Sequence, residues 1–113
     1  MRTSPGPRNA KVCVRSSSIH GRGLFACRRI AKGERIGRYE GPIVDRDGDH
    51  VLWVYDETSG REVGICGQNE LRYVNHSPRP NACFYGDELE ALRTIQIGDE
   101  ITHDYGWEWA GVH

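Results

Sequence analysis

Hydrophobic and polar residues alternate along this chain in short runs, and Gly, Pro or Asp separates one run from the next. Alternation with a period of two is typical of a β-strand that buries one face. The runs that predict strands lie at 11–19, 35–39, 43–44, 51–55, 62–66, 82–85 and 89–95. Helical periodicity is nearly absent, and residues 68–74 allow one or two turns of helix. The pattern therefore predicts a mainly β domain of many short strands with little helix.

Turn residues divide these runs and set the organisation of the chain. Residues 51–55 form its most apolar run, and the turn at 56–60 folds this run back on 62–66 as a predicted hairpin. Similar glycine-containing turns are predicted at 31–34 and 97–100. Residues 1–10 show no periodicity and are predicted to form a disordered leader, and the remaining length suits one domain.

The charge of the chain is balanced overall. Its 15 basic and 16 acidic residues leave a net charge of −1, whereas proteins that bind nucleic acid usually carry a basic face. No direct nucleic-acid partner is therefore expected. The middle of the chain is locally acidic and would suit a basic peptide, although a solvated loop is the commoner role of such a run. The acidic residues concerned are Asp45, Asp47, Asp49, Asp56 and Glu57.

Membrane and metal partners are not expected either. No apolar run approaches the roughly 18 residues of a membrane span, and the start of the chain lacks the apolar core of a signal peptide. We expect a cytoplasmic protein, or one that acts in a host nucleus if the chain is viral or an effector. The cysteines form no Cys-x-x-Cys pair and do not cluster with histidines, so most should be small buried hydrophobic residues: Cys13, Cys27, Cys66 and Cys83.

Three polar stretches carry candidate chemistry. Residues 72–78 read Arg-Tyr-Val-Asn-His-Ser-Pro, and residues 98–106 read Gly-Asp-Glu-Ile-Thr-His-Asp-Tyr-Gly. Residues 20–26 read His-Gly-Arg-Gly-Leu-Phe-Ala, and two glycines one residue apart let backbone amides approach a ligand or turn sharply. Alone, this Gly-x-Gly is more often a tight turn, because it lacks the third glycine of a dinucleotide-binding motif.

In chain order the first motif is 20–26, the second is 72–78, followed by Pro80-Asn81, and the third is 98–106. With the three motifs in this order, the chain resembles the SET-domain protein lysine methyltransferases from about residue 11 to residue 107. The resemblance is to a minimal form, like those of bacteria and large viruses, without the cysteine-rich segments that flank many eukaryotic SET domains. It implies a SET domain over 11–107 and a short C-terminal tail at 108–113. The implied fold is a set of small curved β-sheets in which the last motif threads, like a knot, under a loop near residues 75–76.

The resemblance also implies a site for S-adenosylmethionine, which leaves as S-adenosylhomocysteine. The implied cofactor-binding residues are His20, Gly21, Arg22, Gly23, Arg72, Tyr73, Asn75, His76 and Tyr105. The Asn75 side-chain amide and the His76 backbone would bind the amino group and the adenine. Tyr105 would be the catalytic residue. The channel for the target lysine would be lined by Tyr39, Phe84, His103 and Trp107.

Two departures from the family pattern bear on this implied site. His103 stands two positions before Tyr105, where Phe or Tyr usually helps to set how many methyl groups are added, so that number stays open. No cysteine-rich segment follows the last motif to complete the channel, and Trp107 or Trp109 is the candidate to close it.

The expected function is transfer of a methyl group to a lysine side chain of a protein, with a histone or a histone-like basic protein as substrate. This in-line displacement needs no metal, so the protein has to align the reactants and exclude water. The alternative is a catalytically silent SET-fold module that binds peptide or cofactor, and turnover distinguishes the two. A homodimer is an open alternative to a monomer.

Overall fold

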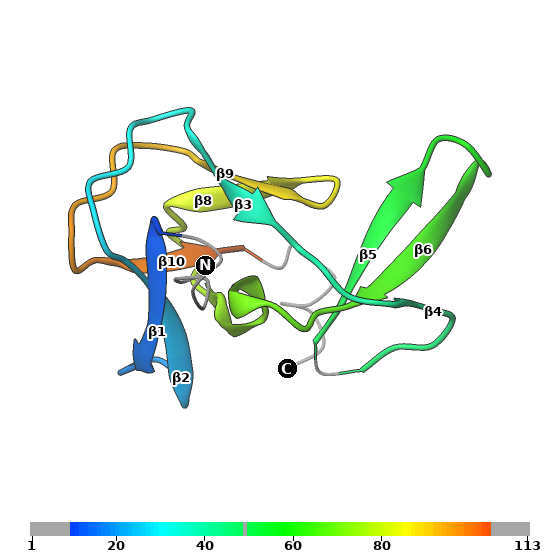
Figure 1. The fold of residues 1–113 in the computed structure, drawn as a ribbon, viewed down its shortest axis with the longest axis horizontal. Coiled ribbons are helices and arrows are strands. Elements are labelled where there is room, and N and C mark those ends of the chain that lie inside the picture. The colour runs from blue at the N-terminus through cyan, green and yellow to red at the C-terminus, as the bar shows by residue number, and fades with distance from the viewer. Residues whose placement is uncertain (1–9, 49, 105–113) are drawn as a thin grey trace, which may run out of the picture.

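The computed structural model describes residues 10–48 and 50–104. In this part of the chain, ten short strands and one short 3₁₀ helix make up the regular structure (Figure 1). In chain order they are β1 (Val12–Ser16), β2 (Arg22–Ala26), β3 (Arg35–Arg38), β4 (Ile43–Val44), β5 (Val51–Asp56), β6 (Arg61–Cys66), η1 (Glu70–Tyr73), β7 (Asn75–His76), β8 (Ala82–Tyr85), β9 (Glu88–Ala91) and β10 (Glu100–His103). The prediction of a mainly β domain with little helix is confirmed.

The strands of the described residues form three small sheets. The first has the order β1-β2-β10-β7, in which β2 is antiparallel to β1 and β10, and β10 is parallel to β7. The second has the order β3-β9-β8 and the third the order β4-β6-β5, with antiparallel pairs in both. Figure 1 shows the predicted β5–β6 hairpin extending away from the other two sheets.

A small hydrophobic core holds the first two sheets and η1 together. Its largest fully buried side chains come from five elements and from the connections between them: Leu24, Ile30, Ile36, Leu71, Leu89, Ile95 and Ile101. Full burial of one such side chain stabilises the fold by about 1.5–3 kcal/mol. Because Leu71 of η1 and Ile101 of β10 share this core with Leu24 of β2, the three motifs of the sequence are held near one another.

Alternation along the sequence does not predict β2, β7 or β10, and these strands complete the first sheet. In β2, the consecutive residues Gly23 and Leu24 are buried, and in β10 residues 101–103 are all buried, so neither strand alternates. Residues 75–76, where the sequence predicts a loop, form a two-residue strand because they pair with β10. Alternation therefore fails to predict three of the four strands in the sheet that carries the candidate motifs.

Two predicted strands are shorter than expected. The run 11–19 ends as a strand at Ser16, because the Ser17 hydroxyl accepts hydrogen bonds from the Ile19 and His20 amides and forms a turn. The run 89–95 ends at Ala91, since Ile95 bridges to Ile30 of another connection.

Three further expectations concern burial and topology. All four cysteines are only partly buried, so the prediction that most of them are buried is wrong. No helix within residues 10–48 and 50–104 is long and apolar enough to cross a membrane. The predicted knot-like threading stays a prediction, because the chain from residue 105 onward lies outside the described residues.

Candidate active site

A cavity of about 750 Å³ opens between the β1–β2 turn, η1 and β7. Its walls are formed by Ile19, His20, Gly21, Arg22, His50, Arg72, Tyr73, Val74, Asn75 and His76. Seven of the predicted cofactor-binding residues are in this set: His20, Gly21, Arg22, Arg72, Tyr73, Asn75 and His76. The fold thus brings the first two motifs to one cavity, of a size typical of small-molecule sites.

The third motif reaches this cavity through the pairing of β7 with β10. Asn75 pairs with Thr102, and His76 pairs with His103, in parallel register. His76 Nδ1 also lies 3.7 Å from Asp104 Oδ1, just beyond the end of β10. The other edge of β10 pairs with β2, the strand that follows the glycine turn. One strand therefore links all three motifs.

The side-chain amide of Asn75 is surrounded by oxygen atoms on one side. Its Nδ2 atom donates to the backbone carbonyls of His20 and Arg22 at 3.2 and 3.1 Å. It also lies 2.9 Å from Glu100 Oε2 and 3.2 Å from Ser17 Oγ. The carbonyls and the carboxylate can only accept hydrogen bonds, so the nitrogen must face them and Asn75 Oδ1 points to the opposite side.

Glu100 and Ser17 are residues to which the sequence assigns no role. Ser17 Oγ lies 2.9 and 2.8 Å from the two carboxylate oxygens of Glu100. Glu100 does belong to the third motif, and that is the one signal in the sequence that points to it. Ser17 has no comparable signal, because its partners are remote in the sequence.

Gly23 lies beside this carboxylate and is absent from the cavity wall. A Cβ atom at this position would lie 2.2 Å from Glu100 Oε2 and 3.0 Å from the Ser17 Cβ atom. Any side chain here would displace the Glu100 carboxylate. A contact of Gly23 with the cofactor stays a prediction, whereas its observed effect is to leave room for Glu100.

Arg72 and Tyr73 form a compact pair on the cavity wall. Arg72 Nη2 donates to the Tyr73 hydroxyl at 2.6 Å, and the guanidinium carbon lies 4.8 Å from the centre of the Tyr73 ring. This hydrogen bond lowers the pKa of Tyr73, and the charges of Arg72 and Arg22 act in the same direction. The Tyr73 ring also meets the ring of His50 edge-on at 6.3 Å. Nothing in the sequence pointed to His50, which lies at the cavity only because the fold places it against Tyr73.

Three predicted channel residues form a row of aromatic rings. The rings of Tyr39 and Phe84 lie 5.7 Å apart, and those of Phe84 and His103 lie 5.1 Å apart, with edge-on geometry in both pairs. The Tyr39 hydroxyl donates to the backbone carbonyl of His50 at 2.6 Å. A Cβ atom on Gly67 would lie 2.4 Å from Cζ of Tyr39, so the ring packs where only glycine leaves space. His50 links this row to the cavity.

Burial and the nearby His76 lower the pKa of His103 from 6.5 to about 4. Burial is the larger cause, because a charged imidazolium loses its hydration there. The Asp104 carboxylate acts in the opposite direction but is outweighed. His103 is therefore neutral near pH 7 and contributes an uncharged ring to the aromatic row.

Two of the predicted site residues, Tyr105 and Trp107, and the alternative Trp109, lie outside the described residues. No group of three or more histidine, cysteine or acidic side chains able to hold a metal ion occurs within residues 10–48 and 50–104.

Comparison with known proteins bears on the identity of this site. A family model described as SET domain matches residues 21–106. The chain is 31% identical over 121 residues to the histone-lysine N-methyltransferase MEDEA of Arabidopsis thaliana, and 34% identical over 116 residues to histone-lysine N-methyltransferase 2B of Homo sapiens. These matches cover 86% and 83% of this chain but only 17% and 4% of the two relatives.

Solved structures share the fold at low sequence identity. The methyltransferase domain of human PR domain-containing protein 2 aligns with a TM-score of 0.68 and 22% identity, over 86% of this chain and 78% of that one. The methyltransferase domain of human histone-lysine N-methyltransferase SETMAR aligns with a TM-score of 0.70 and 20% identity, over 85% of this chain and 44% of that one. The family model spans most of the residues that build the cavity and the aromatic row, and the chain belongs to the SET-domain family.

Proposed function

We propose that this chain is an S-adenosylmethionine-dependent protein-lysine N-methyltransferase. The observation that carries the proposal is the meeting of two distant motifs, 20–22 and 72–76, around one cavity. A hydrogen bond from Tyr39 to His50 of the cavity wall links this cavity to the row of aromatic rings. The names of the two relatives support the activity. Because the chain spans only a small part of each relative, their substrates and partners do not transfer with the match.

The residues of the cavity fit S-adenosylmethionine. The guanidinium groups of Arg22 and Arg72 flank the Tyr73 hydroxyl and would attract the carboxylate of the methionine part. Asn75 Oδ1, on the amide side away from Glu100, would accept a hydrogen bond from the amino group. The rings of Tyr73 and His50 offer apolar surface to the adenine.

When bound, S-adenosylmethionine supplies an electrophilic methyl group on a positively charged sulfur. The protein has to hold the lysine amine in line with that methyl group and to keep water away. The aromatic faces of Tyr39 and Phe84 suit both tasks, and a ring face near a cation contributes about 0.5–2 kcal/mol. His103 adds no competing positive charge, because it is neutral near pH 7.

The lysine amine must lose its proton before it attacks. A free lysine has a pKa of about 10.4, and an apolar channel disfavours the ammonium form. The Tyr105 hydroxyl would then orient the neutral amine, a role that does not require Tyr105 to ionise. This assignment of Tyr105 rests on its place in the third motif.

A basic, extended segment such as a histone tail is the proposed substrate. β5 is an outer strand of its sheet, where the backbone of an extended segment can pair, and Trp53 and Tyr55 on it are exposed. Part of the acidic run serves other contacts. Asp47 accepts from the Trp53 indole at 3.3 Å, and Asp56 caps the turn that follows β5. Asp45 lies 3.9 Å from Arg46 Nε in an exposed ion pair, and Glu57 is an exposed acidic group available to attract a basic segment.

The test is transfer of a labelled methyl group from S-adenosylmethionine to purified histones and to a cell extract. We expect a labelled protein with the wild-type chain, and the mass of the modified peptide would then identify the lysine. Tyr105→Phe is the control. It should bind S-adenosylmethionine within a few-fold of wild type by calorimetry, because it removes only the hydroxyl, while turnover falls by at least about a hundredfold.

The outcomes separate the enzyme from the silent module. Labelling that disappears in Tyr105→Phe supports the enzyme. Full activity of this variant would remove Tyr105 from the reaction. Cofactor binding without any labelling, in histones or in extract, would favour the silent SET-fold module.

A further inference from the structure

The balanced net charge of the chain conceals a strong separation of charge along it. Residues 10–38 contain eight basic residues and one acidic residue, Glu34, whereas the chain as a whole has 15 basic and 16 acidic residues. The basic residues are Lys11, Arg15, Arg22, Arg28, Arg29, Lys32, Arg35 and Arg38. Such a segment is basic enough to attract a polyanion if the fold keeps its side chains together.

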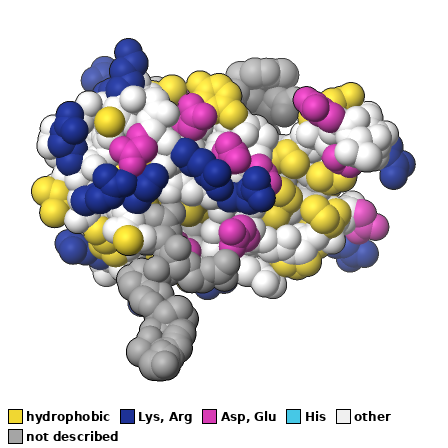
Figure 2. Space-filling view, turned by 45° about the horizontal axis from the view of Figure 1, so that its top comes forward, with side chains coloured by type: hydrophobic (Ala, Val, Ile, Leu, Met, Phe, Trp, Pro, Cys, Tyr) yellow, Lys and Arg dark blue, Asp and Glu magenta, His cyan; other side chains and the backbone are white. Residues whose placement is uncertain are grey.

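The fold gathers most of these side chains at one end of the β1–β2 hairpin. Figure 2 shows Lys and Arg side chains most densely over the left half and centre of this face, interspersed with Asp and Glu, and a few more at its right edge. The hairpin turn at residues 17–21 contributes to the cavity, whereas Lys11 and the connection 27–34 lie at the other end of the paired strands. A five-residue strand spans about 17 Å, so the basic end is separated from the cavity.

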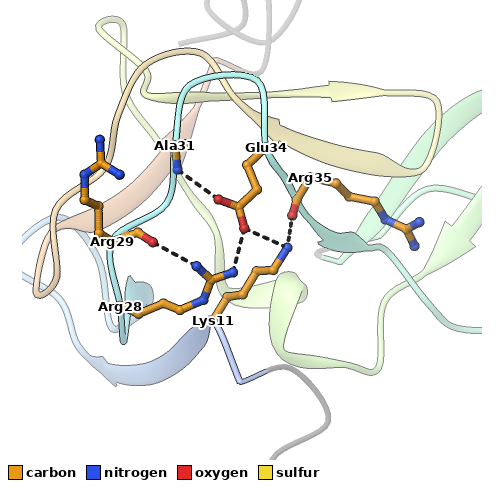
Figure 3. Close-up of polar contacts among 6 residues, drawn as sticks. All are labelled: Lys11, Arg28, Arg29, Ala31, Glu34 and Arg35. Atoms are coloured by element: carbon orange, nitrogen blue, oxygen red, sulfur yellow. Dashed lines mark hydrogen bonds and ion pairs between the residues drawn. The ribbon is translucent and has the colours of Figure 1, made fainter.

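Glu34 organises this basic end (Figure 3). Its Oε2 atom lies 2.6 Å from Arg28 Nη2 and 3.1 Å from Lys11 Nζ, and its Oε1 atom accepts from the Ala31 amide at 2.9 Å. Lys11 Nζ also donates to the Arg35 carbonyl. One carboxylate thus holds two cations, and the cluster keeps a positive charge.

The basic groups around this cluster are exposed and outnumber the acidic groups that face them. Arg29 and Lys32 are both exposed, and neither forms an ion pair with another described residue. Acidic groups on neighbouring elements offset part of the charge: Glu88 lies 3.5 Å from Arg35, Glu90 is opposite Arg35 in the sheet, and Asp99 lies beside Ala26. Arg93, on the connection that contains Asp99, adds one more positive charge.

We propose that the surface formed by Arg28, Arg29, Lys32 and Arg35 binds the phosphate backbone of double-stranded nucleic acid. The guanidinium groups favour this partner, since they form paired hydrogen bonds with phosphate oxygens. A single strand would need aromatic rings on which its bases stack, and Phe25, the one aromatic residue in 10–38, is partly buried. The surface therefore suits a regular array of phosphates and no base sequence in particular.

An acidic protein is a weaker fit for this surface. Protein interfaces usually centre on an aromatic or aliphatic anchor. Residues 10–38 leave one large hydrophobic side chain open, Ile19, and it lies at the cavity end of the hairpin. Beside the basic end, Ile97 on the connection that pairs with Ala26 is also exposed, so competition with poly-glutamate is needed to distinguish the two partners. The proposal departs from the expectation, based on net charge, that the chain has no nucleic-acid partner. It does not depend on the proposed enzymatic function.

The experiment measures binding of a labelled DNA duplex by fluorescence anisotropy at salt concentrations from about 50 to about 200 mM. Four phosphate contacts predict a slope of log K against log salt of about −3 to −4. The test variant is Arg29→Glu/Lys32→Glu, which reverses two exposed charges without touching Glu34. The matched control is Arg46→Glu/Arg61→Glu, which changes the net charge equally at two exposed positions on the β4–β6–β5 side.

We expect the test variant to lose at least about tenfold in duplex affinity, with a slope shallower by about 2, and the control to stay within about threefold. Both variants should keep the circular dichroism spectrum and the cooperative thermal unfolding of wild type, which shows that they are folded. An equal loss in both variants would overturn the proposal, because net charge alone would then explain binding. Poly-glutamate that competes as well as duplex at equal ionic strength would overturn it in favour of an acidic protein partner. Absence of cofactor binding in wild type would contradict the proposed enzymatic function, but it would not affect the conclusion on duplex binding.

Discussion

Asn75 illustrates how a single residue is positioned for its role. Its amide nitrogen faces the Glu100 carboxylate and two backbone carbonyls, so an acceptor at this place would be repelled. An aspartate would bring a second negative charge to within about 3 Å of Glu100, which is strongly unfavourable where water is scarce. An amide suits this place, because its nitrogen donates to the protein and its oxygen is left for the hydrogen bond that we propose it accepts from the cofactor.

We predict that Asn75→Ala weakens S-adenosylmethionine binding at least about tenfold. The substitution removes the acceptor Oδ1 and leaves partly buried oxygens without their donor, at a cost of about 1–3 kcal/mol. Isothermal calorimetry measures the affinity. Asn69→Ala is the matched control, because Asn69 binds the backbone of Arg38 and Glu40 away from the cavity wall. Unchanged affinity in Asn75→Ala would remove this residue from the site.

The low pKa of His103 predicts how stability depends on pH. The pKa is about 4 in the folded chain and 6.5 for an ordinary histidine, so the unfolded chain binds a proton between these values while the folded chain does not. The free energy of unfolding should therefore fall as pH decreases from about 6.5 to about 4, by about 3 kcal/mol, and this contribution should be constant above pH 6.5. Urea unfolding at several pH values measures it.

His103→Phe is the control for this prediction. Phenylalanine keeps a ring against Phe84 but cannot bind a proton, so the loss of stability between pH 6.5 and 4 should largely disappear. Above about pH 4.5, Glu34 does not contribute to the pH dependence. Its pKa is about 2 because the Ala31 amide, Lys11 and Arg28 stabilise the carboxylate, so its contribution is lost only below about pH 4.5. An equally steep loss in the variant would mean that another group titrates.

Among the elements, β10 lies inside its sheet but has little strand pairing to hold it there. It is the strand between β2 and β7, yet it pairs with each of them through only two residues. Asn81, from the connection before β8, supplies further hydrogen bonds. Its Nδ2 atom donates to the Glu100 carbonyl, and its Oδ1 atom accepts from the Thr102 amide, both at 2.9 Å. The asparagine that follows Pro80 in the second motif is thus a clamp on the third.

We predict that Asn81→Ala lowers the free energy of unfolding by about 2–4 kcal/mol, because it removes the side-chain partner of one buried amide and one partly buried carbonyl of β10. Thermal and urea unfolding measure the change. Asn69→Ala, which also removes two side-chain bonds to backbone but at a more accessible place, should cost less, since water can replace them. Similar losses in the two variants would contradict the role of Asn81 as a clamp.

In the molecule as a whole, each of the three small sheets contributes different parts of the site and of the surface. The β1-β2-β10-β7 sheet carries the cavity at one end and the basic surface at the other, and the β3-β9-β8 sheet supplies Phe84. The β4-β6-β5 sheet contributes exposed residues and an open edge. Its strand β5 alternates between exposed and partly buried positions, whereas residues 101–103 of β10 are all buried.

We predict that backbone amides of residues 51–56 exchange with deuterium at least about tenfold faster than those of 100–103. Local opening of a strand that buries few side chains costs less free energy than opening of a buried central strand. Hydrogen exchange followed by mass spectrometry measures both segments in one experiment. Equal protection of the two segments would show that the β5–β6 hairpin is as firmly held as the core.

The sequence alone was sufficient for several conclusions about this protein. Short alternating runs and turn residues predict a β domain with a β5–β6 hairpin. A half-buried strand alternates with a period of two, so adjacent residues are enough to recognise it. Three motifs in order were enough to point to the SET-domain family and to seven residues that line the cavity. These features depend on residues close together in the sequence, so they can be recognised without the tertiary structure.

Other features were decided only by the tertiary structure. β2 and β10 lack alternation because both of their faces are buried, and β7 exists because β10 lies beside it. Ser17, His50 and Asn81 gained their partners from segments far away in the chain. The low pKa of His103 and the clustering of basic residues follow from burial and proximity. Burial and proximity are properties of the folded chain, since they depend on which distant residues the packing of the core brings together.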